Sequence, residues 1–353
     1  MTTLLAGDIG GTKTLLATYR LQAGHLELLR QQRYPSGAWA DFAAMVAHFL
    51  AAAAAAGEEP PRHGCFAVAG PVIGGQVKVT NLPWQLDQDA LAGACGLESL
   101  ELVNDFAVLI YGLPHLAADQ QQPLRPGPCS KASPGGSSAH PSGPPLAILG
   151  AGTGLGAAIG VPGPGGLIAL ASEASHAEFA PRSEAEWRLK RWLANDLGLE
   201  RVSVERVVSG TGLGHVARWL LAERDPAGSH PLAGDLPDLP AAVASAADRG
   251  DPLAAEALAL WLGAYGSAAG DLALQCLCRG GLWLGGGTAP KMLHHLRSPA
   301  FLEPLCAKGR LSPLLQAIPL MAIIDPEAGL FSAACRARML LEDGMAESWA
   351  GGS

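Results

Sequence analysis

The chain has 353 residues, of which 49% are hydrophobic and only 16% are charged, and its formal net charge is −8. This length predicts about two domains, and the composition predicts large packed cores and not disorder. The acidic balance excludes a nucleic acid as the main partner, because polyanions are bound by an excess of lysine and arginine, whereas a small phosphorylated ligand needs only a local cradle.

The cysteines and the N-terminal segment indicate a cytoplasmic protein with no membrane contact. No cysteines form a Cys-x-x-Cys pair and no His/Cys cluster has zinc spacing, so we expect reduced thiols. The N-terminus lacks the basic start and the long apolar stretch of a signal peptide. We also expect no segment with the ~20 apolar residues that span a bilayer.

The first third of the chain predicts a mixed sheet. Residues 3–35 favour three consecutive strands, the first of which ends at Asp8, and an alanine-rich helix is expected over residues 39–56. Further strands are expected at 64–71, 74–81 and 100–106. Three antiparallel strands followed by alternating helix and strand predict a mixed α/β sheet.

Residues 120–145 interrupt this pattern, and the pattern then restarts. Pro, Gly and Ser make up 16 of these 26 residues, which predicts a flexible surface insertion. Residues 145–161 again favour a strand, a glycine turn and a second strand, followed by a strand at 166–172. We therefore expect two domains of similar topology, each of which begins with a glycine-rich hairpin.

The rest of the chain is predicted to be mostly helical. Ser183 and Glu186 have the spacing of a capping box, ahead of a helix that Gly198 ends. Helices over 212–225, 251–277 and 327–343 carry apolar faces of helical period, and strands are expected at 281–285 and 318–325.

The stretch GDIGGTKT at residues 7–14 is the first candidate site. It lacks the spacing of a Walker A loop, and strand-like sequence follows it where a dinucleotide fingerprint needs a helix. A glycine turn between two strands lets backbone N–H groups face an anion. Because the Asp8 carboxylate would repel a phosphate, a cation between them, Mg²⁺, is implied. A plain hairpin turn is the alternative.

Two later glycine turns are also candidates. Gly152-x-Gly154-x-x-Ala157 matches a degenerate dinucleotide pattern, which leaves a nicotinamide-dependent oxidoreductase open as a hypothesis. Against it, the sequence after the loop favours a strand and not a helix, and no ribose-binding acid follows at the expected distance. The turn LGGGTAP at 284–290 could let backbone pass close to a base or ribose, and a plain left-handed turn is the alternative.

Several polar residues occupy positions where α/β proteins bind ligands. Asn104 and Asp105 come at the carboxyl end of a strand, although Asp105 could instead cap a helix. Glu173 and His176 lie three residues apart in SEASHAEFAP, where a structural histidine is the alternative. Glu205 lies in a partly apolar run, where an ion pair with Arg201 or Arg206 is the alternative.

Taken together and in order, these motifs resemble those of the bacterial-type glucokinase family, within the sugar kinase and actin-like ATPase superfold. The resemblance rests on GDIGGTK, AVAGPV…TNLPW (67–84), VNDF (103–106), GAGTGLG (150–156), SEASHAEFAP (172–181), ERVVSGTGLG (205–214) and LGGGTAPK (284–291). A related family of repressors and sugar kinases shares DIGGTK but usually carries a cysteine-rich zinc motif, which this sequence lacks.

The resemblance implies two ribonuclease-H-like α/β domains with mixed sheets flanking a central cleft. The smaller domain would comprise residues 1–113 plus about 330–353, with the first phosphate loop and the sugar and base residues. The larger would comprise 114–329, with the second phosphate loop and the adenosine motif, and the 120–145 insertion.

The resemblance also implies an activity, the phosphorylation of glucose at its 6-hydroxyl by ATP with Mg²⁺, in a cytoplasmic homodimer. Alternatives are a kinase for another hexose, such as mannose or fructose, and a sugar-binding sensor without turnover. Phosphoryl transfer to an alcohol needs positioning, charge neutralisation and an acceptor for the hydroxyl proton.

The roles that the resemblance implies fall on named residues. Asp105 would be the catalytic base, and Asp8 would act on Mg²⁺ through water. The nucleotide would be held by Asp8, Gly10, Gly11, Thr12 and Lys13, by Gly152, Thr153 and Gly154, and by Gly285, Gly286 and Gly287. The sugar would be held by Asn81, Asn104, Asp105, Glu173, His176 and Glu205.

Two departures from the family pattern bear on specificity. The usual GEGGH is SEASH here, with Ala174 and Ser175 in place of glycines, so a position that needs positive φ or close backbone approach would be altered. Lys13 replaces a common asparagine and could add a positive charge near the nucleotide, or be an ordinary surface lysine.

Overall fold

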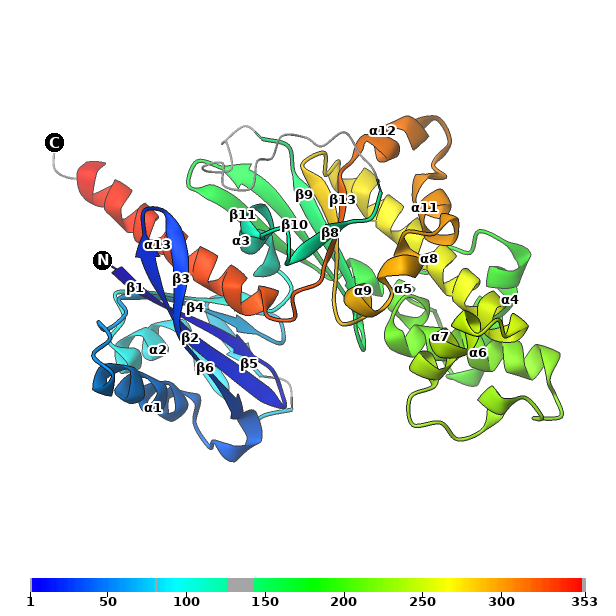
Figure 1. The fold of residues 1–353 in the computed structure, drawn as a ribbon, viewed down its shortest axis with the longest axis horizontal. Helices are drawn as coiled ribbons and strands as arrows, with labels where there is room; N and C mark the ends of the chain where they lie inside the picture. Colours follow the sequence, from blue (N-terminus) through cyan, green and yellow to red (C-terminus); the bar gives the residue numbers. More distant parts are fainter. Residues whose placement is uncertain (1, 80, 126–142, 351–353) are drawn as a thin grey trace.

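Two mixed sheets of similar connectivity form the framework of the protein (Figure 1). The computed structural model describes residues 2–79, 81–125 and 143–350, with side chains up to residue 343. The first sheet has the order β3-β2-β1-β4-β7 and consists of β1 (Thr2–Ile9), β2 (Lys13–Gln22), β3 (His25–Pro35), β4 (His63–Val68) and β7 (Ser99–Asn104). The second has the order β11-β10-β9-β12-β13-β8 and consists of β8 (Gln121–Pro123), β9 (Leu146–Ala151), β10 (Leu155–Gly163), β11 (Gly166–Ser172), β12 (Gly281–Gly285) and β13 (Leu320–Ile323).

Each sheet begins with three antiparallel strands and continues with two parallel strands. In the first sheet β1, β2 and β3 are antiparallel neighbours, while β4 and β7 run parallel to β1. In the second, β9, β10 and β11 repeat the hairpins, and β12 and β13 run parallel to β9. This confirms the predicted mixed α/β class. Because β10 and not a helix follows Gly154, the dinucleotide interpretation of that loop is wrong.

Part of the predicted insertion is ordered structure. Residues 121–123 form the edge strand β8, antiparallel to β13, so the prediction of a flexible segment from residue 120 is wrong for that part. The prediction for residues 126–142 lies outside the described residues. A small separate hairpin is formed by β5 (Gln76–Lys78) and β6 (Gln85–Asp87).

Helices cover both faces of the first sheet. One face packs against α1 (Phe42–Ala55) and α2 (Gln88–Cys95), where Phe42, Phe49 and Phe66 are buried. The other face packs against α13 (Ala328–Ala350), which lies along β1 and β4 (Figure 1). The short α3 (Leu109–Gly112) contacts α13 and also strands β9 to β11, so one buried cluster runs from the first sheet to the second.

The remaining helices surround the other face of the second sheet. They are α4 (Glu184–Asp196), α5 (Val204–Val207), α6 (Gly210–Arg224), α7 (Leu239–Asp248), α8 (Pro252–Cys276), α9 (Thr288–Lys291), α10 (Leu293–Leu296), α11 (Pro299–Cys306) and α12 (Ser312–Ala317). The predicted start of α4 is confirmed, because Ser183 Oγ accepts from the Glu186 N–H at 3.2 Å, and Gly198 follows in a left-handed conformation. No specific helix was predicted for the segments that form α2, α7, α11 and α12.

The helix α8 meets the length and hydropathy of a membrane span, which contradicts our expectation that no segment would. It is the only such helix among the described residues, and 67% of its most apolar window is buried inside the protein. Trp261 and Tyr265, near its middle, are almost fully buried in the core of the second sheet and its helices. Its hydropathy therefore reflects packing on all sides.

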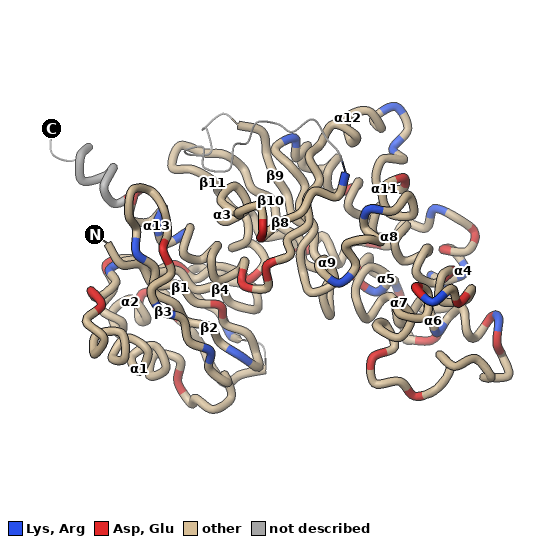
Figure 2. Tube along the Cα trace, viewed as in Figure 1, with Lys and Arg blue, Asp and Glu red and all other residues tan. Residues whose placement is uncertain are grey.

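Charged residues of both signs are interspersed around α4 and α6 (Figure 2). Lys190 pairs with Glu178, and Arg224 pairs with Glu256. The six described cysteines are free thiols, and Cys129 lies outside the described residues.

Candidate active site

Asp8, Asn104 and Asp105 come together because three parallel strands end at one level. Ile9 is opposite Val68 in the register of β1 and β4, and Val68 is opposite Asn104 in that of β4 and β7. The backbone N–H of Asp105 donates to the Val68 carbonyl at 2.9 Å. The carboxyl edge of this sheet therefore carries two carboxylates, Asp8 at the end of β1 and Asp105 after β7, with β4 between them.

Asn104, and not Asp105, caps the turn that follows β7. Its Oδ1 accepts from the N–H groups of Phe106 and Ala107, both at 3.0 Å. Its Nδ2 donates to the Gly70 carbonyl at 3.1 Å and to Asp105 Oδ1 at 3.0 Å. The alternative that Asp105 is a helix cap is therefore wrong, and its carboxylate is oriented by a neighbour while it stays exposed.

The electrostatic environment of Asp105 suits proton transfer near neutral pH. Desolvation by the surrounding protein, followed by the charge of Asp8, raises the pKa of Asp105 to about 6, although the N–H of Phe106 and the Asn104 amide act in the opposite direction. A carboxylate with this pKa is mostly ionised at pH 7 and yet can hold a proton.

The carboxylate of Asp8 is the other charged group at this edge. Burial raises the pKa of Asp8, and the charge of Lys13 partly offsets that rise. Its Oδ2 lies 3.5 Å from where a Cβ of Gly329 would stand, in the first turn of α13. Asp8 belongs to none of the ion pairs formed by the described side chains. Carboxylate oxygens without a basic partner are suitable donors for a hard cation such as Mg²⁺.

The turn from Gly10 to Lys13 is held by a residue that the sequence analysis missed. Gly10 N–H donates to the Lys13 carbonyl at 3.0 Å, which closes the turn. Ser36, fully buried, donates through Oγ to the Gly10 carbonyl at 2.8 Å and through its N–H to the Thr12 carbonyl at 3.0 Å. Gly11 is half-buried, and Thr12 and Lys13 are exposed.

The second glycine loop is held by the segment that contains Glu205. Glu205 Oε2 accepts from the Leu155 N–H at 2.9 Å and lies 2.5 Å from where a Cβ of Gly154 would stand. Gly210 N–H donates to the Gly152 carbonyl at 2.7 Å, and Thr211 Oγ1 donates to the Thr153 carbonyl at 3.0 Å. Neither Arg201 nor Arg206 forms an ion pair with Glu205 in the described part of the chain, so that alternative is wrong.

The third glycine turn lies directly beside the second. Gly285 is opposite Gly150 in the pairing of β12 with β9. Gly286 has φ +77°, and a Cβ there would stand 2.4 Å from the Ala151 carbonyl oxygen, so only glycine fits. Thr288 Oγ1 donates to the same carbonyl at 2.6 Å. The two loops therefore form one continuous backbone surface.

Phe106 connects the first sheet to the second glycine loop. Its ring atoms lie 2.4 Å from where a Cβ of Gly150 would stand and 2.6 Å from that of Gly156. These two glycines flank the loop 152–154 on β9 and β10. Because Phe106 adjoins Asp105, this contact sets the position of the carboxylate relative to the loop. Glycines within a strand often mark close approach of another group, and this signal was available in the sequence.

The structure does not bring Glu173 and His176 into contact with Asp105. Both are exposed, Glu173 just before and His176 at the end of a short 3-10 turn, Ala174–His176, and His176 Nε2 lies 3.6 Å from Glu173 Oε2. The His176 carbonyl accepts from Arg201 at 2.7 Å. Ala174 and Ser175 do not have positive φ, which among described non-glycine residues occurs only at Ala23, Asn81 and Leu277. The backbone at SEASH therefore does not need the family's glycines.

Asn81 lies apart from the other predicted sugar residues, on the exposed turn between β5 and β6. Its φ of +64° is one that asparagine tolerates better than most side chains.

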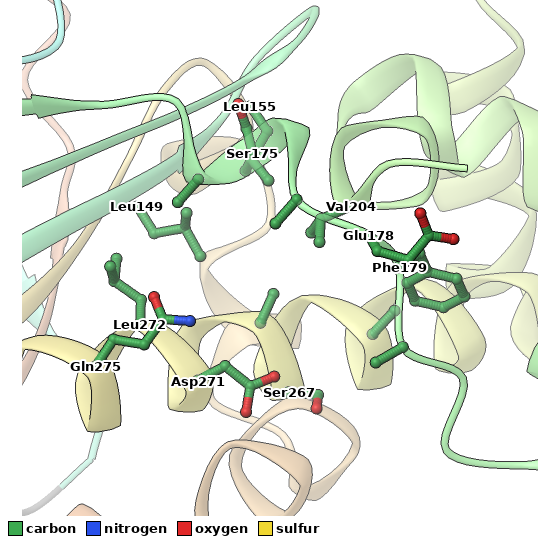
Figure 3. Close-up of a pocket in the computed structure, with 15 residues that line it drawn as sticks. Leu149, Leu155, Ser175, Glu178, Phe179, Val204, Ser267, Asp271, Leu272 and Gln275 are labelled. Carbon is green, nitrogen blue, oxygen red and sulfur yellow. The ribbon is translucent and has the colours of Figure 1, made fainter. Parts of the chain in front are cut away.

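A cavity of about 150 Å³ lies behind the SEASH turn, between it and α8 (Figure 3). Ser175 lines one side, and Asp271 and Gln275 of α8 line the other. Leu149, Leu155, Leu272 and Phe179 make the rest largely apolar. None of the predicted sugar residues lines this cavity.

Comparison with known proteins gives a consistent result over the whole chain. The sequence profile of the glucokinase family matches residues 5–340. A glucokinase of Synechocystis is 40% identical over 94% of this chain and 96% of its own length. The crystal structure of a glucokinase from an Antarctic psychrotroph superposes with a TM-score of 0.81 at 28% identity, covering 96% of this chain and 99% of that one. A glucose complex of the Balamuthia mandrillaris glucokinase has the same fold, with a TM-score of 0.71 at 24% identity over 96% and 94% of the two chains.

Proposed function

The chain belongs to the glucokinase family, and we propose that it transfers the γ-phosphoryl group of ATP to the 6-hydroxyl of glucose, with Asp105 as the base. The observation that supports the assignment of the base is the contact of Phe106 with Gly150 and Gly156. Through it, the turn that carries Asp105 packs against the two strands that flank the glycine loop 152–154, which would hold the transferred phosphate.

Asp105 would accept the proton of the sugar hydroxyl as its oxygen attacks the γ-phosphorus. The O–H bond breaks toward Asp105, a new P–O bond forms, and ADP leaves with the electrons of the broken P–O bond. Asn104 donates to Oδ1, which leaves Oδ2 available for the proton. A base positioned in this way typically contributes about 10²–10⁴-fold to rate.

Asp8 would hold Mg²⁺ through water, next to the phosphates. When bound, Mg²⁺ neutralises charge on the phosphate oxygens. The observation that supports this is the Asp8 carboxylate. Burial raises its pKa, and among the described residues it forms no ion pair with a basic side chain. The exposed Lys13 lies near enough to lower the pKa of Asp8, so it would add positive charge on the same side.

The nucleotide would lie across the three glycine turns. Gly10, Gly11 and Thr12 would face the phosphates from the first sheet, and Gly152, Thr153 and Gly154 from the second. Gly285, Gly286 and Gly287 would take the adenosine, because at Gly286 the chain passes the second loop without a side chain.

The sugar would be held by Asn104 and Asp105 from the first sheet and by Glu173, His176 and Glu205 from the second, with Asn81 at the side. Glu173 and His176 are exposed and do not contact Asp105. We therefore propose that they reach the sugar as the two sheets close around it, which would also exclude water as a competing acceptor.

Two further expectations belong to the same proposal. We propose a cytoplasmic location, on the acidic composition and the reduced thiols of the described residues. We also propose a homodimer, which light scattering of the purified protein would test.

A hexose-panel assay tests the function. Purified protein is incubated with ATP, Mg²⁺ and glucose, mannose or fructose, and product and ADP are both measured. We expect glucose 6-phosphate to form fastest. Faster turnover of mannose or fructose would make that hexose the substrate in place of glucose. Glucose binding measured by calorimetry, without release of ADP, would indicate a sugar sensor without turnover.

A further inference from the structure

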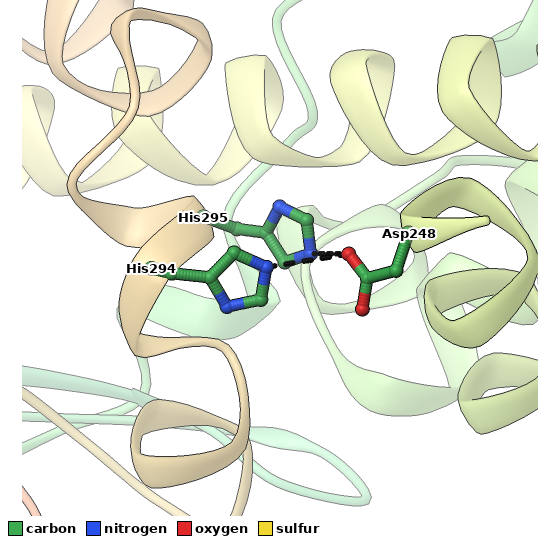
Figure 4. A group of neighbouring side chains, drawn as sticks. All are labelled: Asp248, His294 and His295. Atoms are coloured by element: carbon green, nitrogen blue, oxygen red, sulfur yellow. Dashed lines mark hydrogen bonds and ion pairs between the residues drawn. The ribbon is translucent and has the colours of Figure 1, made fainter. Parts of the chain in front are cut away.

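Three side chains with metal-binding atoms converge at a place that includes none of the candidate active-site residues. Asp248 is the last residue of α7, and His294 and His295 belong to α10 (Figure 4). Nε2 of His294 lies 3.3 Å from Asp248 Oδ1, and Nε2 of His295 lies 3.1 Å from the same oxygen. The potential ligand atoms of all three residues lie within 4.8 Å of one another.

Hydrogen bonding accounts for only one of these contacts, that of His294 Nε2 with Asp248 Oδ1 at 3.3 Å. Two imidazoles point at one carboxylate oxygen, and their ring centroids are only 3.7 Å apart. Nε2 of His295 is buried and has no hydrogen-bond partner of good geometry among the described residues. A buried polar atom without a partner usually signals an unseen water or ion.

The spacing is that of ligands around a tetrahedral ion. Zinc bonds to imidazole nitrogen and carboxylate oxygen are about 2.0–2.2 Å long, so two ligands of one tetrahedral ion stand about 3.3–3.5 Å apart. The two nitrogen–oxygen separations, 3.3 and 3.1 Å, are close to this. Asp248 and His294 are about half exposed or more, which leaves a fourth position for water.

The donor set and its surroundings favour a transition metal over Mg²⁺. Imidazole ligands suit Zn²⁺ and Co²⁺, whereas Mg²⁺ prefers an all-oxygen octahedron. The nearby Arg249 is directed away, because its guanidinium donates to Ser245 at 2.5 Å. The C-terminal end of α7 also carries partial negative charge that favours a cation.

We propose that Asp248, His294 and His295 form a binding site for a divalent transition-metal ion, Zn²⁺ or Co²⁺, that ties α7 to α10. The segment α9–α10 follows directly on the turn Gly285–Gly287. The bound ion therefore fixes α10, the second short helix after the third glycine turn, against α7, which lies more than forty residues earlier in the chain. This site is independent of the Mg²⁺ that phosphoryl transfer requires.

The experiment uses the full chain, freed of metal by chelation and dialysis and kept in excess Mg²⁺. Zn²⁺ alone is added and the melting temperature is followed, and Co²⁺ alone is added and its visible absorption is recorded. We expect the melting temperature to rise with Zn²⁺ concentration. We also expect Co²⁺ to give the intense visible bands of a tetrahedral site.

Variants separate this site from binding by free thiols such as Cys276. His294→Ala removes an exposed ligand, Asp248→Asn removes the carboxylate, and His25→Ala is the matched control for an exposed histidine elsewhere. Because loss of even an outer-shell partner costs about 10–100-fold in metal affinity, each ligand variant should weaken Zn²⁺ binding at least tenfold. His25→Ala should bind like the parent protein.

The metal-free melting temperature of each variant shows whether it has folded. The same Zn²⁺ shift in the combined His294→Ala and Asp248→Asn variant would overturn the proposal, and so would the absence of any Zn²⁺ shift or tetrahedral Co²⁺ spectrum in the parent protein.

Discussion

Asn104 donates a hydrogen bond to the carboxylate of Asp105, from Nδ2 to Oδ1 at 3.0 Å, while its own carbonyl oxygen caps the turn that follows. The two residues thus divide two tasks that one side chain could not perform together. Asn104 satisfies the backbone, and Asp105 is left free to exchange a proton.

We predict that Asp105→Asn separates activity from stability. Turnover should fall by about 10²–10⁴-fold or more, because the amide cannot accept the hydroxyl proton. Since the pKa of Asp105 is raised in the folded protein, its ionised form is less favourable there than in the unfolded chain. Neutral asparagine should therefore leave the melting temperature at pH 8 equal or higher. Near-normal turnover of this variant would show that Asp105 is not the catalytic base.

This stability effect should depend on pH in a defined sense. Below the unfolded pKa, near 3.8, both proteins are neutral at this position and should melt alike. As pH rises through about 6, the parent protein ionises at Asp105 and loses the advantage of the neutral form. Melting curves at a series of pH values would show the difference, and a difference that shrinks with rising pH would contradict it.

The pH dependence of turnover should show the same group. We predict that kcat/KM for glucose declines as pH falls below about 6, because the protonated carboxyl cannot act as a base. The measurement is the pH profile at saturating ATP and Mg²⁺, with the fold checked by circular dichroism at each pH. A profile that stays flat down to pH 5 would exclude a base with this pKa.

Gly156→Ala should reduce both turnover and stability. A Cβ there would stand 2.6 Å from the Phe106 ring, so the ring must shift and carry Asp105 with it. Overpacking of this kind costs about 1–3 kcal/mol. Gly93→Ala is the matched control, because nothing lies within 4 Å of its Cβ position in α2, and it should stabilise the helix by roughly 0.5–1 kcal/mol.

A double-mutant cycle tests whether Phe106 is the cause. In a Phe106→Ala background, Gly156→Ala should lose most of its cost, because the clashing ring is gone. Urea unfolding of the four proteins gives the coupling energy. If Gly156→Ala lowers the free energy of unfolding equally in both backgrounds, the Phe106 ring is not the source of the clash.

Glu205→Gln and Glu205→Ala should have different effects on the two substrates. The glutamine amide oxygen can still accept from the Leu155 N–H, so Glu205→Gln should preserve the second glycine loop and the KM for ATP. Its KM for glucose should rise, since a carboxylate is lost from the sugar. Glu205→Ala should raise both KM values. An unchanged glucose KM in Glu205→Gln would exclude Glu205 from the sugar site.

The sequence predicted the strands and glycine turns well, because both have strong local signals. Asp8 and Asn104 follow apolar strands that end at one level, and the restart at residue 145 revealed the second sheet. The nature of the cap after β7 was not predictable, because either Asn104 or Asp105 could serve. Helix α7 was missed, although five of its ten residues are alanine, a strong helix former.

Relationships between distant residues were the largest gap. No role was predicted for Phe106, since nothing nearby in sequence shows that it lies on Gly150 and Gly156. Ser36, which braces the first turn, follows a strand more than twenty residues later. Asp248 and His294 are likewise far apart in sequence, so a search for His/Cys clusters with zinc spacing could not bring them together.

The last helix has a consequence for how this protein is synthesised. Ala334 and Cys335 of α13 are buried with Leu4 and Ala6 of β1, and the first turn of α13 lies beside Asp8. During synthesis, the face of the first strands that α13 covers therefore stays unpacked until nearly the whole chain has left the ribosome. The carboxylate proposed for Mg²⁺ acquires its environment only then, so a prematurely terminated chain should be inactive even though every residue proposed for the chemistry has already been translated.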